Sequence, residues 1–258
     1  MNELLALASD YSRQALFTGF VVFLRVGAAM ALLPAFGERS VPQRIRLVLG
    51  LAFTLIVAPA VTDKVSAIAA QETVLGVFLI TEVIAGLAIG ISLRLFVLAL
   101  QTAGAMAAQS TSLSQLFGGA GADPAPAIGH IMLVSGLALA VMMGFHVRVV
   151  EYLILSYEVL PAGQFPGTGD MADWGVAQIA NAFSLAFSLA APFVIASLVY
   201  NTALGVINRA MPQLMVSFIG APAITAGGLL LLFLSLPILL SIWVDGLNSF
   251  LADPFSVR

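Results

Sequence analysis

The sequence has no cysteine and very little charge. Of its 258 residues, none is Cys and only 9% are Asp, Glu, Lys or Arg, with a net charge of −3. Without Cys, the chain has neither disulfide bonds nor thiolate metal sites. The small net charge gives no indication of a nucleic-acid partner. Because soluble domains carry about a quarter charged residues, the composition also excludes an ordinary soluble domain.

Recognisable catalytic and metal-binding patterns are missing as well. The two histidines, His130 and His146, are too far apart in sequence to ligate one metal ion from successive turns of a helix. Asp170 and Asp173 stand in a predicted loop without a catalytic partner. The chain has no phosphate-binding loop, nucleophile elbow or dinucleotide turn. We therefore expect no enzymatic activity, no cofactor and no bound metal.

The chain consists largely of apolar runs. It is 60% hydrophobic, and its mean hydropathy is +1.06. A helix needs about 20 apolar residues to cross the hydrocarbon core of a membrane, and four of the seven runs qualify as simple spans. We predict an all-α, polytopic membrane protein with six or seven apolar helical segments in a single helical domain, residues 1–258. The runs are Ala15–Phe36, Leu47–Val61, Thr73–Leu93, Leu95–Ala108, Ala127–Phe145, Val176–Tyr200 and Leu214–Val244.

The lengths of these runs are irregular. Leu47–Val61 is short, and Leu95–Ala108 is shorter still and could continue the helix before it. Leu214–Val244 is too long for one straight span and contains Pro222 and Pro237, each of which predicts a kink or a break. A helix that is buried inside a larger protein assembly need not match the thickness of the bilayer, so the lengths favour such an assembly.

Two charged residues lie in the middle of apolar runs, Arg25 in the first and Glu82 in the third. A charge at the centre of a bilayer costs about 2.5–3.5 kcal/mol on insertion scales, so such residues face a bundle interior or a partner. These residues therefore predict a buried polar contact that fixes assembly or a satisfied interhelical salt bridge or hydrogen bond without chemistry. The alternative is a proton or substrate site of a secondary transporter. A purely polar contact would tolerate Glu82→Gln, because an amide still forms hydrogen bonds, whereas a proton carrier would not.

The helix that carries Glu82 also contains Gly86 and Gly90 in a GxxxG pattern, which permits close approach of a second helix. A different kind of feature separates the last two apolar regions. There Arg209, Pro212 and Gln213 form a cationic, proline-containing interruption that is poorly suited to lipid. We expect this segment to pack on a neighbouring subunit of an assembly.

Four stretches resemble the FliR family, the R component of the flagellar type III export gate, which is also related to an injectisome component. They are Leu32–Pro59, Thr81–Gly104, Gly144–Gly163 and Ala203–Leu232, and they follow the order of the family. The string GVINRAMPQLMV in the last stretch is the most specific. The flagellar branch is the better match.

The resemblance implies a structural subunit, not an enzyme, in the bacterial inner membrane at the flagellar basal body. It implies that one R chain joins several FliP- and FliQ-type subunits to form the channel through which unfolded flagellar axial proteins leave the cytoplasm. FlhB- and FlhA-type gate components are further implied partners, besides membrane lipid. In such a core, many apolar helices pack on sister subunits instead of crossing lipid one by one.

The resemblance also assigns a role to the polar stretch STSLSQLFGGAGADPAP, residues 110–126, as a loop that projects into the pore and helps to plug it. Family members usually carry spaced bulky apolar residues there, often phenylalanines, followed by Asp-Pro. This chain departs from that pattern, with a longer glycine spacer before Asp123-Pro124. The alternative interpretation is an ordinary solvated loop. The predicted plug residues are Leu113, Leu116, Phe117, Gly118 and Gly119.

Overall fold

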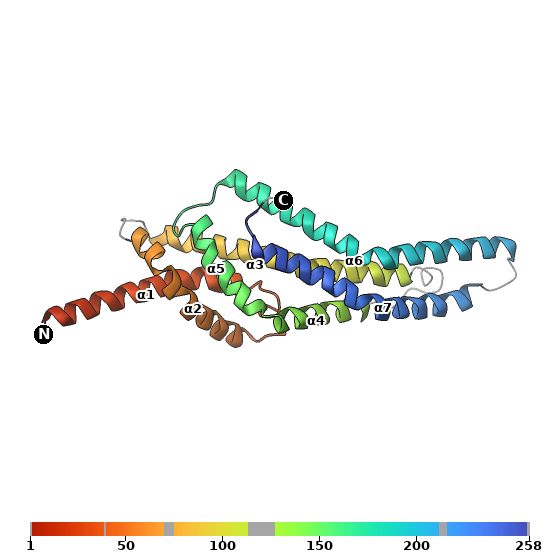
Figure 1. Ribbon diagram of the computed structural model, residues 1–258, viewed down its shortest axis with the longest axis horizontal. Coiled ribbons are helices and arrows are strands. Elements are labelled where there is room, and N and C mark those ends of the chain that lie inside the picture. The colour runs from red at the N-terminus through yellow and green to blue at the C-terminus, as the bar shows by residue number, and fades with distance from the viewer. Residues whose placement is uncertain (1, 39, 70–74, 113–126, 212–215, 257–258) are drawn as a thin grey trace. The chain divides into compact units, whose positions relative to one another are not determined.

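The computed structural model describes residues 2–38, 40–69, 75–112, 127–211 and 216–256. These residues form seven α-helices and no β-strand, which confirms the prediction of an all-α fold (Figure 1). The helices are α1 (Asn2–Met30), α2 (Gln43–Ala69), α3 (Leu75–Ser112), α4 (Ala127–Met142), α5 (Phe145–Val159), α6 (Thr168–Ala210) and α7 (Val216–Ala252).

The number of candidate membrane spans reaches the lower end of the six or seven apolar segments that the sequence predicted when one bent helix pair is counted as a span. Among the described residues, five helices are long and apolar enough to cross a membrane, or six if the bent pair α4 and α5 counts as one span. From Leu75 onward, the runs Thr73–Leu93 and Leu95–Ala108 belong to one helix, α3, because no helix-breaking residue separates them. The run Ala127–Phe145 instead ends early, and α5 follows it after a bend of 73°. Gly144 at this bend has φ 83°, a left-handed conformation that favours glycine.

Each proline of the last apolar run predicted a kink or a break, and the break is wrong, because α7 continues through both Pro222 and Pro237. A kink at either proline stays a prediction. Pro59 in α2 and Pro192 in α6 are likewise inside helices. Each proline removes only one hydrogen bond of the helical ladder. A fully unwound segment in apolar surroundings would leave more backbone groups without partners, so the helix persists.

The described residues divide into two compact units. The first unit contains Met1–Leu95, Val141–Gln178 and Phe250–Arg258, and the second contains Phe96–Ala140 and Ile179–Ser249. The boundaries fall inside α3, α6 and α7 and near the bend between α4 and α5. That residues 1–258 make a single helical domain stays a prediction.

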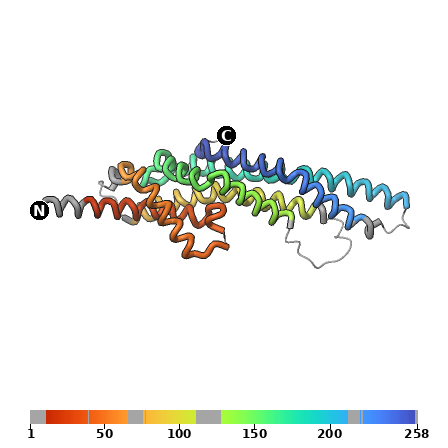
Figure 2. Tube along the Cα trace, turned by 60° about the horizontal axis from the view of Figure 1, so that its bottom comes forward, coloured from red at the N-terminus to blue at the C-terminus, as the bar shows by residue number. Residues whose placement is uncertain are grey.

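In the first unit, α1 and α2 lie side by side, and α2 also contacts α5 (Figure 2). Its core is made of fully buried aliphatic side chains from α1, α2, α3 and α5, among them Val22, Val57, Leu93 and Leu153. The ring of Phe36, in the turn after α1, is stacked on Phe145 with ring centroids 6.5 Å apart. The same ring contacts Phe53 edge-on at 5.9 Å. These contacts join the turn after α1, the middle of α2 and the start of α5 around one aromatic cluster.

The turn between α1 and α2 is held by polar contacts. The guanidinium of Arg94 on α3 forms an ion pair with Glu38 in this turn. Arg46 donates to the carbonyl oxygens of Val41 and Glu38, at 3.0 and 3.1 Å. Gly37 lies so close to the end of α1 that a Cβ atom would stand 2.8 Å from the carbonyl oxygen of Ala31. Only glycine fits there.

In the second unit, the fully buried Trp243 of α7 organises the packing. Its indole N–H donates to the carbonyl oxygen of Phe96 on α3 at 2.9 Å. The helices α3 and α4 meet at backbone contact, since a Cβ on Gly104 would lie 2.2 Å from the Cα of Gly129. The helices α6 and α7 run side by side in this unit, and the Tyr200 hydroxyl on α6 donates to the carbonyl oxygen of Gly220 on α7 at 2.8 Å (Figures 1 and 2).

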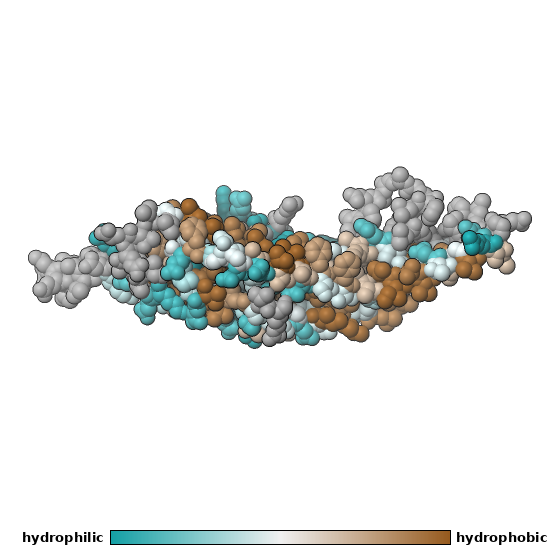
Figure 3. Space-filling model, turned by 90° about the horizontal axis from the view of Figure 1, so that it is seen from above, coloured by the Kyte–Doolittle hydropathy of each residue, from teal (hydrophilic) through white to brown (hydrophobic). Residues whose placement is uncertain are grey.

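Many large apolar side chains remain exposed in both units. Hydrophobic residues reach the surface of the face drawn in Figure 3 between hydrophilic ones. On α6 the side chains of Phe183, Phe187 and Leu198 are 57%, 62% and 67% exposed. On α7 Phe233 is 76% exposed. Monomeric soluble proteins rarely show large apolar patches, so these faces require lipid or another protein as cover.

Candidate functional site

The two charges that lie within apolar runs meet in the structure. Arg25 and Glu82, 57 residues apart in sequence, form a salt bridge in which the side chains are 1% and 0% exposed. The Nε of Arg25 donates to Oε2 of Glu82 at 2.8 Å, and Nη2 donates to Oε1 at 3.0 Å. This fork geometry is the strongest arrangement available to an arginine and a carboxylate. The sequence predicted the burial of both residues but not their pairing.

Four further groups complete the hydrogen bonding of the glutamate and the arginine. The Tyr157 hydroxyl donates to Glu82 Oε2 at 3.2 Å, and the backbone N–H of Gly163 donates to Oε1 at 3.3 Å. Arg25 donates to the Ser156 hydroxyl at 3.0 Å through Nη1. Through Nη2, Arg25 also donates a hydrogen bond to the carbonyl oxygen of Leu160 at 2.8 Å. The pair thereby connects α1, α3, α5 and the turn after α5.

The ring of Tyr157 adds a second interaction with the arginine. The guanidinium carbon of Arg25 lies 3.7 Å from the centroid of this ring, a cation–π geometry. Tyr157, Ser156 and Gly163 contact the buried pair, and the sequence analysis did not name them. They lie in the stretch Gly144–Gly163, whose motif was noted without a role. A serine and a tyrosine side by side in an apolar helix were the available signal, because buried hydroxyls need partners.

Small residues on α3 explain how the helices come close enough for this contact. Glu82, Gly86 and Gly90 are spaced by four residues and therefore share one face of α3. A Cβ on Gly86 would lie 2.2 Å from the carbonyl oxygen of Arg25, and one on Gly90 would lie 2.9 Å from that of Ala29. The GxxxG pattern thus brings α3 into backbone contact with α1, as the sequence predicted.

The hydrogen bonding of the pair limits what it can do chemically. Glu82 accepts four hydrogen bonds, two on each oxygen, which fills the acceptor capacity of a carboxylate. Arg25 uses four of its five N–H groups on partners within the protein. Both side chains are out of contact with solvent. The arrangement therefore suits a rigid connection between helices, and it leaves no lone pair of Glu82 for a substrate.

The other predicted site residues belong to the second unit or lie outside the described residues. Arg209 is exposed in the last turn of α6, in the second unit. Pro212 and Gln213 lie outside the described residues, as do Leu113, Leu116, Phe117, Gly118 and Gly119. Within the described residues, no group of three or more His, Asp or Glu side chains is placed to hold a metal ion.

The sequence of this chain is similar to known export proteins over most of its length. Residues 16–250 match the family described as bacterial export proteins, family 1. The flagellar biosynthetic protein FliR of Caulobacter vibrioides is 35% identical over 231 residues, which cover 89% of this chain and 92% of the relative. This chain belongs to the FliR family of bacterial export proteins. FliR of Escherichia coli is 29% identical over 231 residues, with 85% and 84% covered. FliR of Bacillus subtilis is 27% identical over 231 residues, with 87% and 88% covered.

The family match confirms the resemblance that the sequence motifs predicted. It covers the helices that carry the buried pair and both compact units, since residues 16–250 include most of α1 and nearly all of α7. Together with five helices that are long and apolar enough to cross a membrane, it makes this FliR-family chain a membrane protein of the flagellar export apparatus.

Proposed function

We propose that this FliR-family chain is a structural, pore-forming subunit of the flagellar export gate. With FliP- and FliQ-type subunits it forms the channel through which unfolded flagellar axial proteins leave the cytoplasm, and FlhB- and FlhA-type components are its further partners. The complex lies in the bacterial inner membrane at the flagellar basal body. The chain has no enzymatic role in this process.

The observation that carries this proposal is exposed apolar surface along helices longer than a bilayer. Helix α6 has 43 residues, which correspond to about 65 Å at a rise of about 1.5 Å per residue. The hydrocarbon core of a bilayer covers only about 30 Å of this length. Exposed apolar side chains nevertheless extend along α6 from Val176 to Ile207. Lipid alone does not cover such a helix, so partner subunits are the remaining cover.

The state of the buried pair favours a structural subunit over a secondary transporter. A transporter needs an ionisable or polar site that solvent and substrate reach in turn. Arg25 and Glu82 instead are buried, paired and fully engaged with α5 and the turn that follows it. This arrangement supports a role in holding the fold that the assembly uses.

The plug assignment belongs to the same proposal. Residues 113–126 join the end of α3 to the start of α4, whose backbones meet at Gly104 and Gly129. The loop thus departs from and returns to one close-packed pair of helices. Apolar side chains suit a seal, because a hydrophobic constriction blocks hydrated ions and forms no strong bonds that cargo would have to break.

Co-expression tests the proposal directly. The chain is purified in detergent alone and with its FliP- and FliQ-type subunits from the same genome, and both samples are analysed by size-exclusion chromatography with light scattering. We expect a monodisperse complex from co-expression and aggregation or low yield of the chain alone. A chain that is monodisperse and stable alone, and that does not co-purify with either subunit, would contradict the proposal and favour a transporter.

A further inference from the structure

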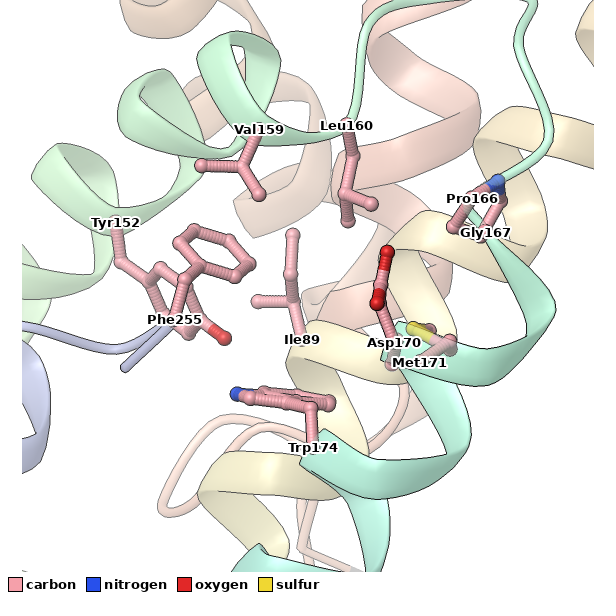
Figure 4. Close-up of a pocket in the computed structure, with 11 residues that line it drawn as sticks. Ile89, Tyr152, Val159, Leu160, Pro166, Gly167, Asp170, Met171, Trp174 and Phe255 are labelled. Carbon is pink, nitrogen blue, oxygen red and sulfur yellow. The ribbon is translucent and has the colours of Figure 1, made fainter. Parts of the chain in front are cut away.

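The first unit contains a cavity that the pore proposal does not use. Its volume is about 190 Å³, and its lining comes from α3, α5, the first turns of α6 and the segment after α7 (Figure 4). Pockets for small-molecule ligands usually have about 300–1,000 Å³. This cavity therefore fits a group of the size of one amino-acid side chain.

Aromatic rings form one side of the cavity. The rings of Trp174 and Phe255 are stacked, with centroids 6.2 Å apart, and Tyr152 meets Phe255 edge-on at 5.4 Å. The indole N–H of Trp174 donates to the carbonyl oxygen of Pro254 at 2.9 Å, which ties the segment after α7 to α6. These contacts hold the rings in place, so their faces do not have to be ordered by a ligand.

A single carboxylate, that of the exposed residue Asp170, lines the cavity together with these rings. Asp170, in the first turn of α6, is the only charged residue among those that line the cavity. Figure 4 shows its carboxylate on the far side of the cavity from the ring of Phe255. Among the described residues it takes part in no ion pair and in no side-chain hydrogen bond. The rest of the lining is mostly apolar, as at Ile89, Val159 and Leu160.

Aromatic faces and a carboxylate around an otherwise apolar cavity are complementary to a cation on an alkyl stem. The negative face of an aromatic ring attracts ammonium and guanidinium groups, and aromatic cages are a common device for binding them. A carboxylate adds a charge-assisted hydrogen bond. Apolar walls accommodate the methylene groups that carry the charge of Lys and Arg.

We propose that this cavity binds a basic side chain, lysine or arginine, of another protein chain, with the cationic group between Asp170 and the rings of Trp174 and Phe255. An amine-containing phospholipid headgroup fits less well, because it would bring a phosphate and no Lys or Arg lines the cavity. The chain's own Lys64 forms an ion pair with Glu158 at 3.0 Å and is not the occupant. This proposal is independent of the pore proposal.

The two tryptophans of the chain provide the measurement. Full-length protein containing fluorotryptophan is purified in an uncharged maltoside detergent and observed by fluorine NMR. Trp174 lies in the cavity, whereas Trp243 is fully buried in the second unit and serves as an internal reference. The probes are short blocked alanine peptides with a central lysine or arginine, and their neutral counterparts with acetyl-lysine or citrulline. A short-chain phosphatidylethanolamine is titrated in parallel.

We expect the lysine and arginine peptides to shift the Trp174 resonance in a saturable way without moving that of Trp243. The neutral peptides should bind with an affinity at least about tenfold lower, since they lose the charge-assisted contacts. Asp170→Asn should weaken binding by a similar factor. The matched control is Asp173→Asn, which removes a carboxylate from the same end of α6 outside the cavity and should leave binding unchanged. Phe255→Leu should also weaken binding. The thermal midpoint of each variant is measured to show that the loss of binding is not a loss of folding.

Several results would overturn the proposal. Equal binding of charged and neutral peptides would make the cavity a purely apolar contact. Phosphatidylethanolamine that shifts Trp174 at lower concentrations than the lysine peptide would make it a lipid site. A Trp174 resonance that no basic peptide shifts, or Asp170→Asn and Asp173→Asn variants that bind equally well, would remove the cation site.

Discussion

Gly86 on α3 lies against the backbone of Arg25 on α1, so close that a Cβ atom on Gly86 would stand 2.2 Å from the Arg25 carbonyl oxygen. The two residues mark the point where the helices carrying the buried pair touch. One turn of helix before Gly86, Glu82 reaches the guanidinium of Arg25. The small residue and the buried charge therefore act together, because a longer distance between the helices would separate the ion pair.

Adding one methyl group at this contact should destabilise the first unit. Gly86→Ala places a Cβ against a backbone oxygen that cannot move aside alone, and such overpacking costs about 1–3 kcal/mol or more. We expect a lower thermal midpoint of the purified complex. The matched control is Gly175→Ala in α6, where nothing lies within 4 Å. There, alanine should be neutral or stabilising, because it favours helix by up to about 1 kcal/mol. Equal midpoints for the two variants would contradict the close contact.

The buried pair should respond differently to single and double replacement. From the sequence alone, Glu82→Gln was expected to be tolerated. The structure reverses this expectation, because the amide would leave the Arg25 guanidinium without a countercharge. Breaking a buried pair from one side costs about 3–5 kcal/mol, whereas replacing both partners by apolar residues costs much less. We expect Glu82→Gln to reduce recovery of the complex strongly, and Arg25→Met with Glu82→Leu to restore part of it.

Export by the double variant then separates a structural role from proton transfer. Motility and secretion of flagellar subunits should follow the amount of assembled complex in both variants. A double variant that assembles like the wild type but exports nothing would show that the pair takes part in transport itself.

The interruption after α6 should matter for assembly. Arg209 is exposed at the end of this helix, so Arg209→Glu is expected to leave folding intact while it places a negative charge at the predicted subunit contact. We expect less FliP- and FliQ-type subunit in a pull-down at normal expression. Arg13→Glu, at an exposed position of α1 in the first unit, is the charge-matched control. A pull-down that is unchanged for Arg209→Glu, or reduced equally by both variants, speaks against a specific contact.

The plug hypothesis predicts a leak. Replacing Leu113, Leu116 and Phe117 together by Ala should leave the complex assembled but let small solutes pass, because the apolar seal is lost. Uptake of a small dye and growth inhibition by salt measure the leak. The control is Ser114→Ala with Gln115→Ala, which changes the same segment without removing apolar groups. Cells that stay tight with the triple variant in an assembled complex would return this segment to an ordinary solvated loop.

The local sequence determined that this is a helical membrane protein and that charged residues are buried within it. Long apolar runs with few charges predict membrane helices because no other backbone arrangement satisfies its hydrogen bonds in lipid. The same reasoning predicts that Arg25 and Glu82 are buried among partners. Glycines spaced by four residues on α3 predict a close helix contact, which the structure places at α1. The sequence motifs were also sufficient to predict the FliR family.

Only the tertiary structure decided which residues meet. Arg25 pairs with Glu82 across 57 positions and with Ser156 across 131, and helical periodicity contains no information on such distances. The unbroken course of α7 through Pro222 and Pro237 and the bend at Gly144 were not predictable from proline and glycine alone. Their local preferences amount to a few kcal/mol at most. The hydrogen bonds and contacts supplied by neighbouring helices outweigh such preferences, so packing and not local propensity sets the final course of the chain.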